Sequence, residues 1–173
     1  MRRLLLVPVL LLGLAGCSEP SSYSAPEREP PATPSAHPCD VVSDEKAADL
    51  LGVDAVTGQA IDNSDLAGGE SIATCQYLRT DPAQPGLTLQ TSATDDFDGL
   101  LAMFSGGGDD LAKVRVEGAE ASALVVDEND LVDIYTVVAL ARGEVHLAVV
   151  DAPSRARAVR TATGAVELLV AGP

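Results

Sequence analysis

The chain has 173 residues, and its 26 acidic and 11 basic residues give a formal net charge of −15 at pH 7. A surface of this charge repels the phosphates of nucleic acid and of anionic lipid headgroups, so we expect no nucleic-acid partner. Aromatic residues make up 3% of the chain and there is no Trp. Their scarcity argues against a carbohydrate-binding platform, which usually stacks sugars on aromatic rings, and against a carrier of apolar ligands.

The first residues have the composition of an export signal. Two arginines precede an apolar run at 4–14, which is well short of the ~20 residues that a membrane-spanning helix needs. The run ends in Leu-Ala-Gly-Cys at 14–17, which resembles the lipobox of bacterial lipoproteins. The resemblance implies that 1–16 form a signal peptide and that the thiol of Cys17 carries lipid after cleavage.

Acylation at Cys17 would hold the mature protein on a membrane, because two or three acyl chains bind a bilayer far more strongly than one. We therefore expect a lipid anchor at the extracytoplasmic face of the cell membrane. Removal of the two signal arginines lowers the formal net charge from −15 to −17. An ordinary secretory signal and a single-span anchor are the alternatives.

Residues 17–37 are rich in Ser, Pro, Ala and Glu and show no apolar period, so we predict a disordered tether. Residues 38–173 suffice for a single α+β domain with one core, and they contain no apolar stretch long enough to cross a membrane. His37, at the end of the tether, is expected only to be solvated.

Lipidation of Cys17 leaves Cys39 and Cys75 as the remaining cysteines. An even count in an oxidising compartment predicts a disulfide, and a loop of this length gains roughly 4 kcal/mol in the chain-entropy model. A redox pair or a metal site is the alternative, but the chain has neither Cys-x-x-Cys spacing nor clustered histidines. We expect no metal and no cofactor.

The opening of the domain predicts a helix followed by a hairpin. Ser43 is a suitable N-cap, two acidic residues occupy the first turn, and Gly52 suits the left-handed C-terminal position. Strand-favouring residues at 71–78 and 87–91 are separated by proline-containing turns. A disulfide would therefore join the start of this helical segment to the first hairpin.

This part of the chain resembles a family of actinobacterial lipoproteins catalogued as a domain of unknown function. In that family a Pro-Cys before a short helix pairs with a Cys in a strand, and the matching residues here are Pro38-Cys39 and Cys75-Gln76-Tyr77. The preference for arginine over lysine also fits an actinobacterial source. The resemblance implies a compact α+β fold, similar to Mog1/PsbP-like lipoproteins or to sensor domains of mycobacterial receptor kinases, and it implies no catalytic residues.

The second half supports the same fold class on its own pattern. Helical spacing of apolar residues predicts a helix at 95–105 and another from Pro153 onward. Three strands are expected, at 111–116, 131–141 and 144–150. The strand at 131–141 is apolar on both of its faces, so we expect it near the centre. Together, these elements predict an antiparallel sheet of about five strands with helices packed against it.

Two acidic clusters, at 95–98 and 127–133, invite comparison with calcium loops. Leu100 and Leu131 stand where the EF-hand pattern needs oxygen ligands, so we predict no metal site, with weak ion binding as the alternative. Gly106–Gly108 leads into carboxylates and lacks a Walker lysine, which argues against a phosphate loop.

His146 lies mid-strand, and we expect it on the sheet without a serine hydroxyl and a carboxylate as partners. No serine lies in a nucleophile-elbow sequence. We therefore predict a non-catalytic binding module that engages an envelope protein, a wall component or a small ligand. The alternative is a carrier that encloses a lipid or another apolar molecule between sheet and helices.

Overall fold

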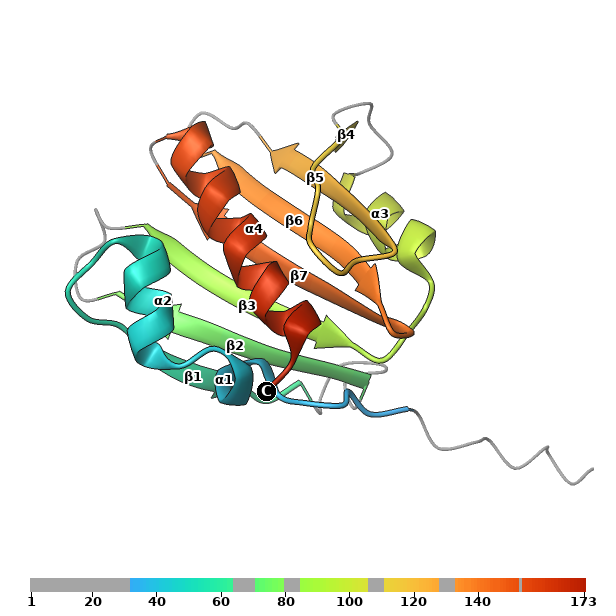
Figure 1. Cartoon of the computed structure of the whole chain (residues 1–173), viewed down its shortest axis with the longest axis horizontal. Coiled ribbons are helices and arrows are strands. Elements are labelled where there is room, and N and C mark those ends of the chain that lie inside the picture. Colours follow the sequence, from blue (N-terminus) through green and yellow to red (C-terminus); the bar gives the residue numbers. More distant parts are fainter. Residues whose placement is uncertain (1–31, 64–70, 80–84, 106–110, 128–132, 153) are drawn as a thin grey trace, which may run out of the picture.

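A seven-stranded sheet forms the centre of the computed structural model, which describes residues 32–63, 71–79, 85–105, 111–127, 133–152 and 154–173 (Figure 1). The sheet is antiparallel, with the order β1-β2-β3-β7-β6-β5-β4. The strands are β1 (Thr57–Ile61), β2 (Ile72–Leu78), β3 (Gly86–Ser92), β4 (Leu111–Ala112), β5 (Ala121–Asp127), β6 (Ile134–Ala141) and β7 (Glu144–Asp151). The helices are α1 (Pro38–Val41), α2 (Asp44–Leu51), α3 (Phe97–Ser105) and α4 (Arg155–Ala171).

The α+β class is confirmed, but the expected number of strands is too low. The sequence pattern missed β1, which contains Gly58 and exposes most of its side chains, so that no apolar alternation marks it. It also missed β5, which begins with Ala-Ser-Ala, residues of weak strand preference. The strand expected at 111–116 is reduced to the two residues of β4. Residues 131–132 and Pro153 lie outside the described part.

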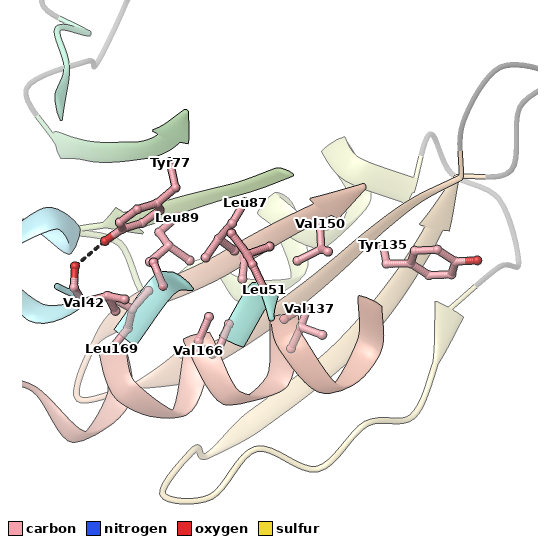
Figure 2. Close-up of a cluster of buried hydrophobic side chains, with 14 of the residues drawn as sticks. Val42, Leu51, Tyr77, Leu87, Leu89, Tyr135, Val137, Val150, Val166 and Leu169 are labelled. Carbon is pink, nitrogen blue, oxygen red and sulfur yellow. Dashed lines mark hydrogen bonds between the residues drawn. The ribbon is translucent and has the colours of Figure 1, made fainter. Parts of the chain in front are cut away.

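Helices α1, α2 and α4 cover one face of the sheet, which we call the covered face (Figure 1). Alternate residues of β6 and β7, such as Val137 and Val150, point from the sheet toward α4 (Figure 2). The side of α4 that meets them is rich in alanine, with Ala158, Ala162 and Ala165 fully buried. Because these side chains are small, the helix axis can lie close to the strands.

The intervening residues of β6 and β7 face the other side, where α3 lies. Val138, Val145 and Leu147 are buried there against Phe97 and Leu100 of α3. The strand predicted to be apolar on both faces is thus interior, with β7 and β5 beside it and helices on both sides. The core therefore has two layers, of which the layer under α4 is the larger.

The predicted caps of α2 are confirmed. The hydroxyl of Ser43 accepts a hydrogen bond from the amide of Lys46 at 3.3 Å, and Gly52 adopts a left-handed φ of 61°. The C-terminal carbonyls of α2 are then bound by α4: Thr161 donates its hydroxyl to the Leu50 carbonyl at 2.8 Å, and Arg157 donates to the Leu51 carbonyl. These bonds satisfy helix-end carbonyls that would otherwise lack partners.

The predicted disulfide between Cys39 and Cys75 is present, with the two sulfurs 2.02 Å apart. It joins α1 to β2, and Cys75 is fully buried. Beside it, the hydroxyl of Tyr77 donates to the carbonyl of Val42, in the connection between α1 and α2 (Figure 2). Burial, and secondarily the nearby Asp44 carboxylate, raise the pKa of Tyr77 to about 12, so the phenol keeps its proton at neutral pH. The opening segment is thus held on the sheet covalently and by a buried hydrogen bond.

Candidate functional site

The residues singled out in the sequence do not form one site. Cys17 lies outside the described residues, and the two other cysteines are joined to each other. Asp95, Asp96 and Asp98 precede or begin α3, where Asp96 accepts a hydrogen bond from the amide of Gly99 at 2.9 Å. Among the described residues, no group of three or more His, Cys, Asp or Glu side chains is arranged to hold a metal ion.

An uncharged surface is left exposed on the α3 side of the sheet. Helix α3 packs against β5 and β6, and no described helix covers the same side of β1, β2 and β3. We call this surface the open face, and its side chains come from residues that alternate with the core residues of the three strands: Thr57, Gln59, Ile61, Gln76, Leu78, Thr88 and Gln90. None of the seven carries a charge, although the chain as a whole has a net charge of −15.

A hollow of about 280 Å³ lies at one end of the open face. Its lining combines apolar side chains with polar ones: Leu78, Ile134, Val149, Gln76, Thr88, Arg79 and Asp151. The volume is close to the lower end of the ~300–1,000 Å³ typical of small-molecule pockets. The hollow therefore has room for a small ligand or for one side chain of a partner.

Two charged groups meet in this hollow. Arg79 forms an ion pair with Asp151 at 2.9 Å, and Asp151 also accepts a hydrogen bond from the amide of Gly86. A side chain at position 86 would begin 2.5 Å from the Asp151 carboxylate, so any larger residue there would push that carboxylate aside. The pair supplies one cationic and one anionic group to whatever enters.

A second cluster lies on the covered face, at the opposite end of β7. His146 is 3% exposed, and its Nδ1 is 3.1 Å from the hydroxyl of Thr91, its neighbour across the β3–β7 pair. Its Nε2 has no hydrogen-bond partner and lies 4.0 Å from a carboxylate oxygen of Glu144. The histidine lies on the sheet as expected. Contrary to expectation, a threonine hydroxyl and a carboxylate lie beside its ring.

Glu144 connects this cluster to the end of the predicted tether. One carboxylate oxygen accepts from the backbone amide of Ser35 at 2.5 Å, and the other accepts from the Ser35 hydroxyl at 2.8 Å. Two residues later, the ring of His37 accepts from the amide of Cys39 at 3.2 Å and caps α1, so its expected role as a merely solvated residue is wrong. The last residues before the domain are therefore in contact with it.

Thr91, His146 and Glu144 place a hydroxyl, an imidazole and a carboxylate in a row, which is also the arrangement that activates a nucleophile in some enzymes. Here Thr91 is 2% exposed and His146 is 3% exposed, so a substrate has no approach to the hydroxyl oxygen in this conformation. Burial lowers the pKa of His146 below its usual value; Glu144 opposes this effect and Arg142 adds to it. The imidazole is therefore neutral at pH 7. The geometry suits a structural or switching contact better than nucleophilic catalysis.

Two further hollows have charged linings. One, of about 390 Å³, lies at the C-terminal end of α4 between Glu117, Arg142 and Glu167. The other, of about 220 Å³, lies beside α2, where Asp44, Glu45, Asp49 and Asp54 line it together with apolar residues such as Val53 and Val56.

No protein-family model, no curated protein and no solved structure matches this chain. The resemblance to actinobacterial lipoproteins therefore stays a prediction, and the functional argument rests on the chain's own residues. Sequence reasoning missed Arg79 with Asp151 and Thr91 with His146, because each pair comes together only through the pairing of distant strands.

Proposed function

We propose that this protein is a lipid-anchored lipoprotein of the cell envelope that acts as a non-catalytic binding module. Its anchor would be Cys17, and its place the extracytoplasmic face of the cell membrane. The observation that carries the binding role is the unequal covering of the sheet. Helices cover one face along its length, whereas on the other face α3 packs over β5, β6 and β7 and leaves the open face and its hollow exposed. Exposed surface of this kind, on a rigid sheet, suits recognition rather than packing.

The tether joins the domain at the end of β7 that lies away from the hollow. Ser35 contacts Glu144 at the start of β7, and the Arg79–Asp151 pair lies at the end of the same strand. At ~3.3 Å per residue the eight residues of β7 separate these two points by roughly 23 Å. The hollow therefore lies on the part of the domain that is remote from the point at which the tether joins it.

The carrier alternative receives less support. A carrier needs an apolar cavity between sheet and helices, and in this structure the space below α4 is occupied by side chains such as Val137, Val150 and Val166 (Figure 2). The hollow at Arg79 and Asp151 contains an ion pair, which an acyl chain would have to desolvate. We therefore favour a polar or amphipathic ligand over a lipid chain.

The anchor is tested with Cys17→Ala. The wild-type protein should enter the detergent phase in a detergent–water partition, and the variant should remain in the aqueous phase because it cannot be acylated. An intact export signal in both proteins keeps translocation the same. Equal partition of the two proteins would contradict the lipid anchor.

The binding role is tested by filling the hollow. Full-length lipoprotein is extracted in mild detergent, and the small molecules that it retains are identified by mass spectrometry. Thr88→Trp places a large side chain in the hollow, whereas Ile61→Trp places the same side chain on the open face beside Thr74, outside the hollow. We expect Thr88→Trp to lose a molecule that the wild type and Ile61→Trp retain. Identical sets of molecules in all three, or none in any, would contradict binding in the hollow.

A further inference from the structure

We propose that Ser35, Glu144 and His146 form a pH-responsive latch, which holds the end of the tether on the domain while the imidazole is neutral and releases it when the imidazole gains a proton. The latch goes beyond the proposed binding role and does not depend on what the open face binds. It concerns how the junction between anchor and domain responds to the surroundings of an exported protein.

The closed state of the latch is set by one carboxylate. Both oxygens of Glu144 accept from Ser35, at 2.5 Å and 2.8 Å, across 109 residues of sequence. The oxygen that accepts from the Ser35 hydroxyl is also the one that lies 4.0 Å from Nε2 of His146. The Glu144 side chain is 14% exposed, so it lies between a surface residue and a buried ring.

On the side of the Glu144 carboxylate that faces the ring, Nε2 of His146 has no hydrogen-bond partner. A neutral imidazole has one donor and one acceptor nitrogen. In the tautomer that carries its proton on Nε2, Nδ1 accepts from the Thr91 hydroxyl. Nε2 then points into a gap of 4.0 Å, which is too long for a hydrogen bond. Buried nitrogens without a partner are rare. Among the described residues, Nε2 of His146 is the one buried side-chain nitrogen or oxygen that has no hydrogen-bond partner.

A second proton on the ring changes the balance at Glu144. Both nitrogens then donate, and a charge-assisted bond from Nε2 to a carboxylate is typically ~2.7–2.9 Å long. Closing the present 4.0 Å gap to that length moves the shared oxygen about 1 Å toward the ring. The same movement draws that oxygen away from the Ser35 hydroxyl, so the ring and Ser35 compete for it.

The pH at which the His146 ring gains its second proton depends on the groups around it. Glu144 on the same strand and Arg142 in the β6–β7 turn are the charged groups that act on it. Its neighbours across the sheet are uncharged, Thr91 on β3 and Ala139 on β6, and the buried residues of α4 are apolar apart from Thr161. Burial therefore places the transition below the usual pKa of histidine, and the junction stays closed at neutral pH.

The test follows the backbone amide of Ser35 by NMR in the full lipoprotein in micelles, titrated from pH 7.5 downward. We expect the Ser35 amide signal to leave its hydrogen-bonded position with the same midpoint as the His146 ring. In His146→Gln this step should vanish. His37→Gln, which alters the other histidine and lies two residues from Ser35, should keep the step.

Three results would overturn the latch: no step in the wild type, the same step in His146→Gln, or loss of the step in His37→Gln instead. Glu144→Ala provides a check that does not depend on substitution in the core, because Glu144 is at the edge of the buried region. Its Ser35 amide should be in the released position at every pH. A hydrogen-bonded Ser35 amide in that variant would also overturn the proposal.

Discussion

The two faces of the sheet differ in what covers them and in the kind of residue they present. The covered face carries Leu87, Leu89 and Val150 under α4 and is closed at one side by the disulfide. The open face carries glutamines and threonines with scattered Ile61 and Leu78, the latter 46% exposed. One face thus supplies most of the buried apolar area, and the other keeps an uncharged surface free.

This division assigns stability and recognition to different residues. Apolar burial contributes to folding in proportion to the area removed from water, so substitutions on the covered face should change the free energy of unfolding strongly. Substitutions on the open face should change it little, because most of their side-chain area is already in water.

Loss of the disulfide should have the largest effect. Cys39 and Cys75 are 36 residues apart, and closing a loop of that length stabilises by about 4 kcal/mol in the chain-entropy model. Urea unfolding of the Cys39→Ala, Cys75→Ala double variant should show a loss of about 2–5 kcal/mol. Reductant should destabilise the wild type and leave the double variant unchanged. A loss below about 1 kcal/mol would mean that the opening helices are held by packing alone.

Matched leucines on the two faces test the comparison directly. Leu89 is fully buried on the covered face, so Leu89→Ala should lower the free energy of unfolding by about 2–5 kcal/mol through lost burial and the cavity it leaves. Leu78→Ala on the open face removes the same atoms and should cost less than about 1 kcal/mol. Chemical denaturation measures both. Equal losses would show that the open face is covered in solution.

Part of this asymmetry was predictable from the sequence. The strands β2, β3 and β7 are rich in strand-favouring residues and lie close to their expected bounds, and the caps of α2 follow from Ser43 and Gly52. The disulfide was predicted from the count of cysteines together with the expected export of the chain. These features depend on local pattern or composition, which a single sequence contains.

The candidate sites were not predictable in the same way. The hollow needs β7 to lie beside β3, which brings Asp151 to Gly86, and the latch needs the same pairing to bring Thr91 to His146. Strand order is decided by how the whole sheet packs, and no local period of the sequence encodes it. The contact between Ser35 and Glu144 was harder still to predict, because the composition around Ser35 indicates a tether and not a packed segment.

Tyr77→Phe should have an intermediate effect. The variant leaves the ring in place on the covered face but removes the hydroxyl that donates to the carbonyl of Val42, whose side chain is fully buried. A buried carbonyl left without its donor costs about 1–3 kcal/mol. Denaturation at pH 7 measures the loss, and Gln76→Ala on the neighbouring open-face position is the control. A change equal to that of the control would mean that water replaces the hydroxyl.

The pH dependence of stability should give the smallest and most diagnostic effect. Because burial lowers the pKa of His146, the unfolded chain binds its proton at a higher pH, near 6.5, than the folded protein does. Between the two pKa values unfolding takes up a proton, so the free energy of unfolding falls as the pH falls through that window. One residue contributes at most about 1.4 kcal/mol per pH unit.

Unfolding measured from pH 7.5 to 5 should therefore show a steeper decline in the wild type than in His146→Gln. The difference between the two curves reports the histidine together with its interaction with Glu144. Parallel curves would mean that the ring is as readily protonated in the folded protein as in the unfolded chain, and that the covered face admits water at this end of β7.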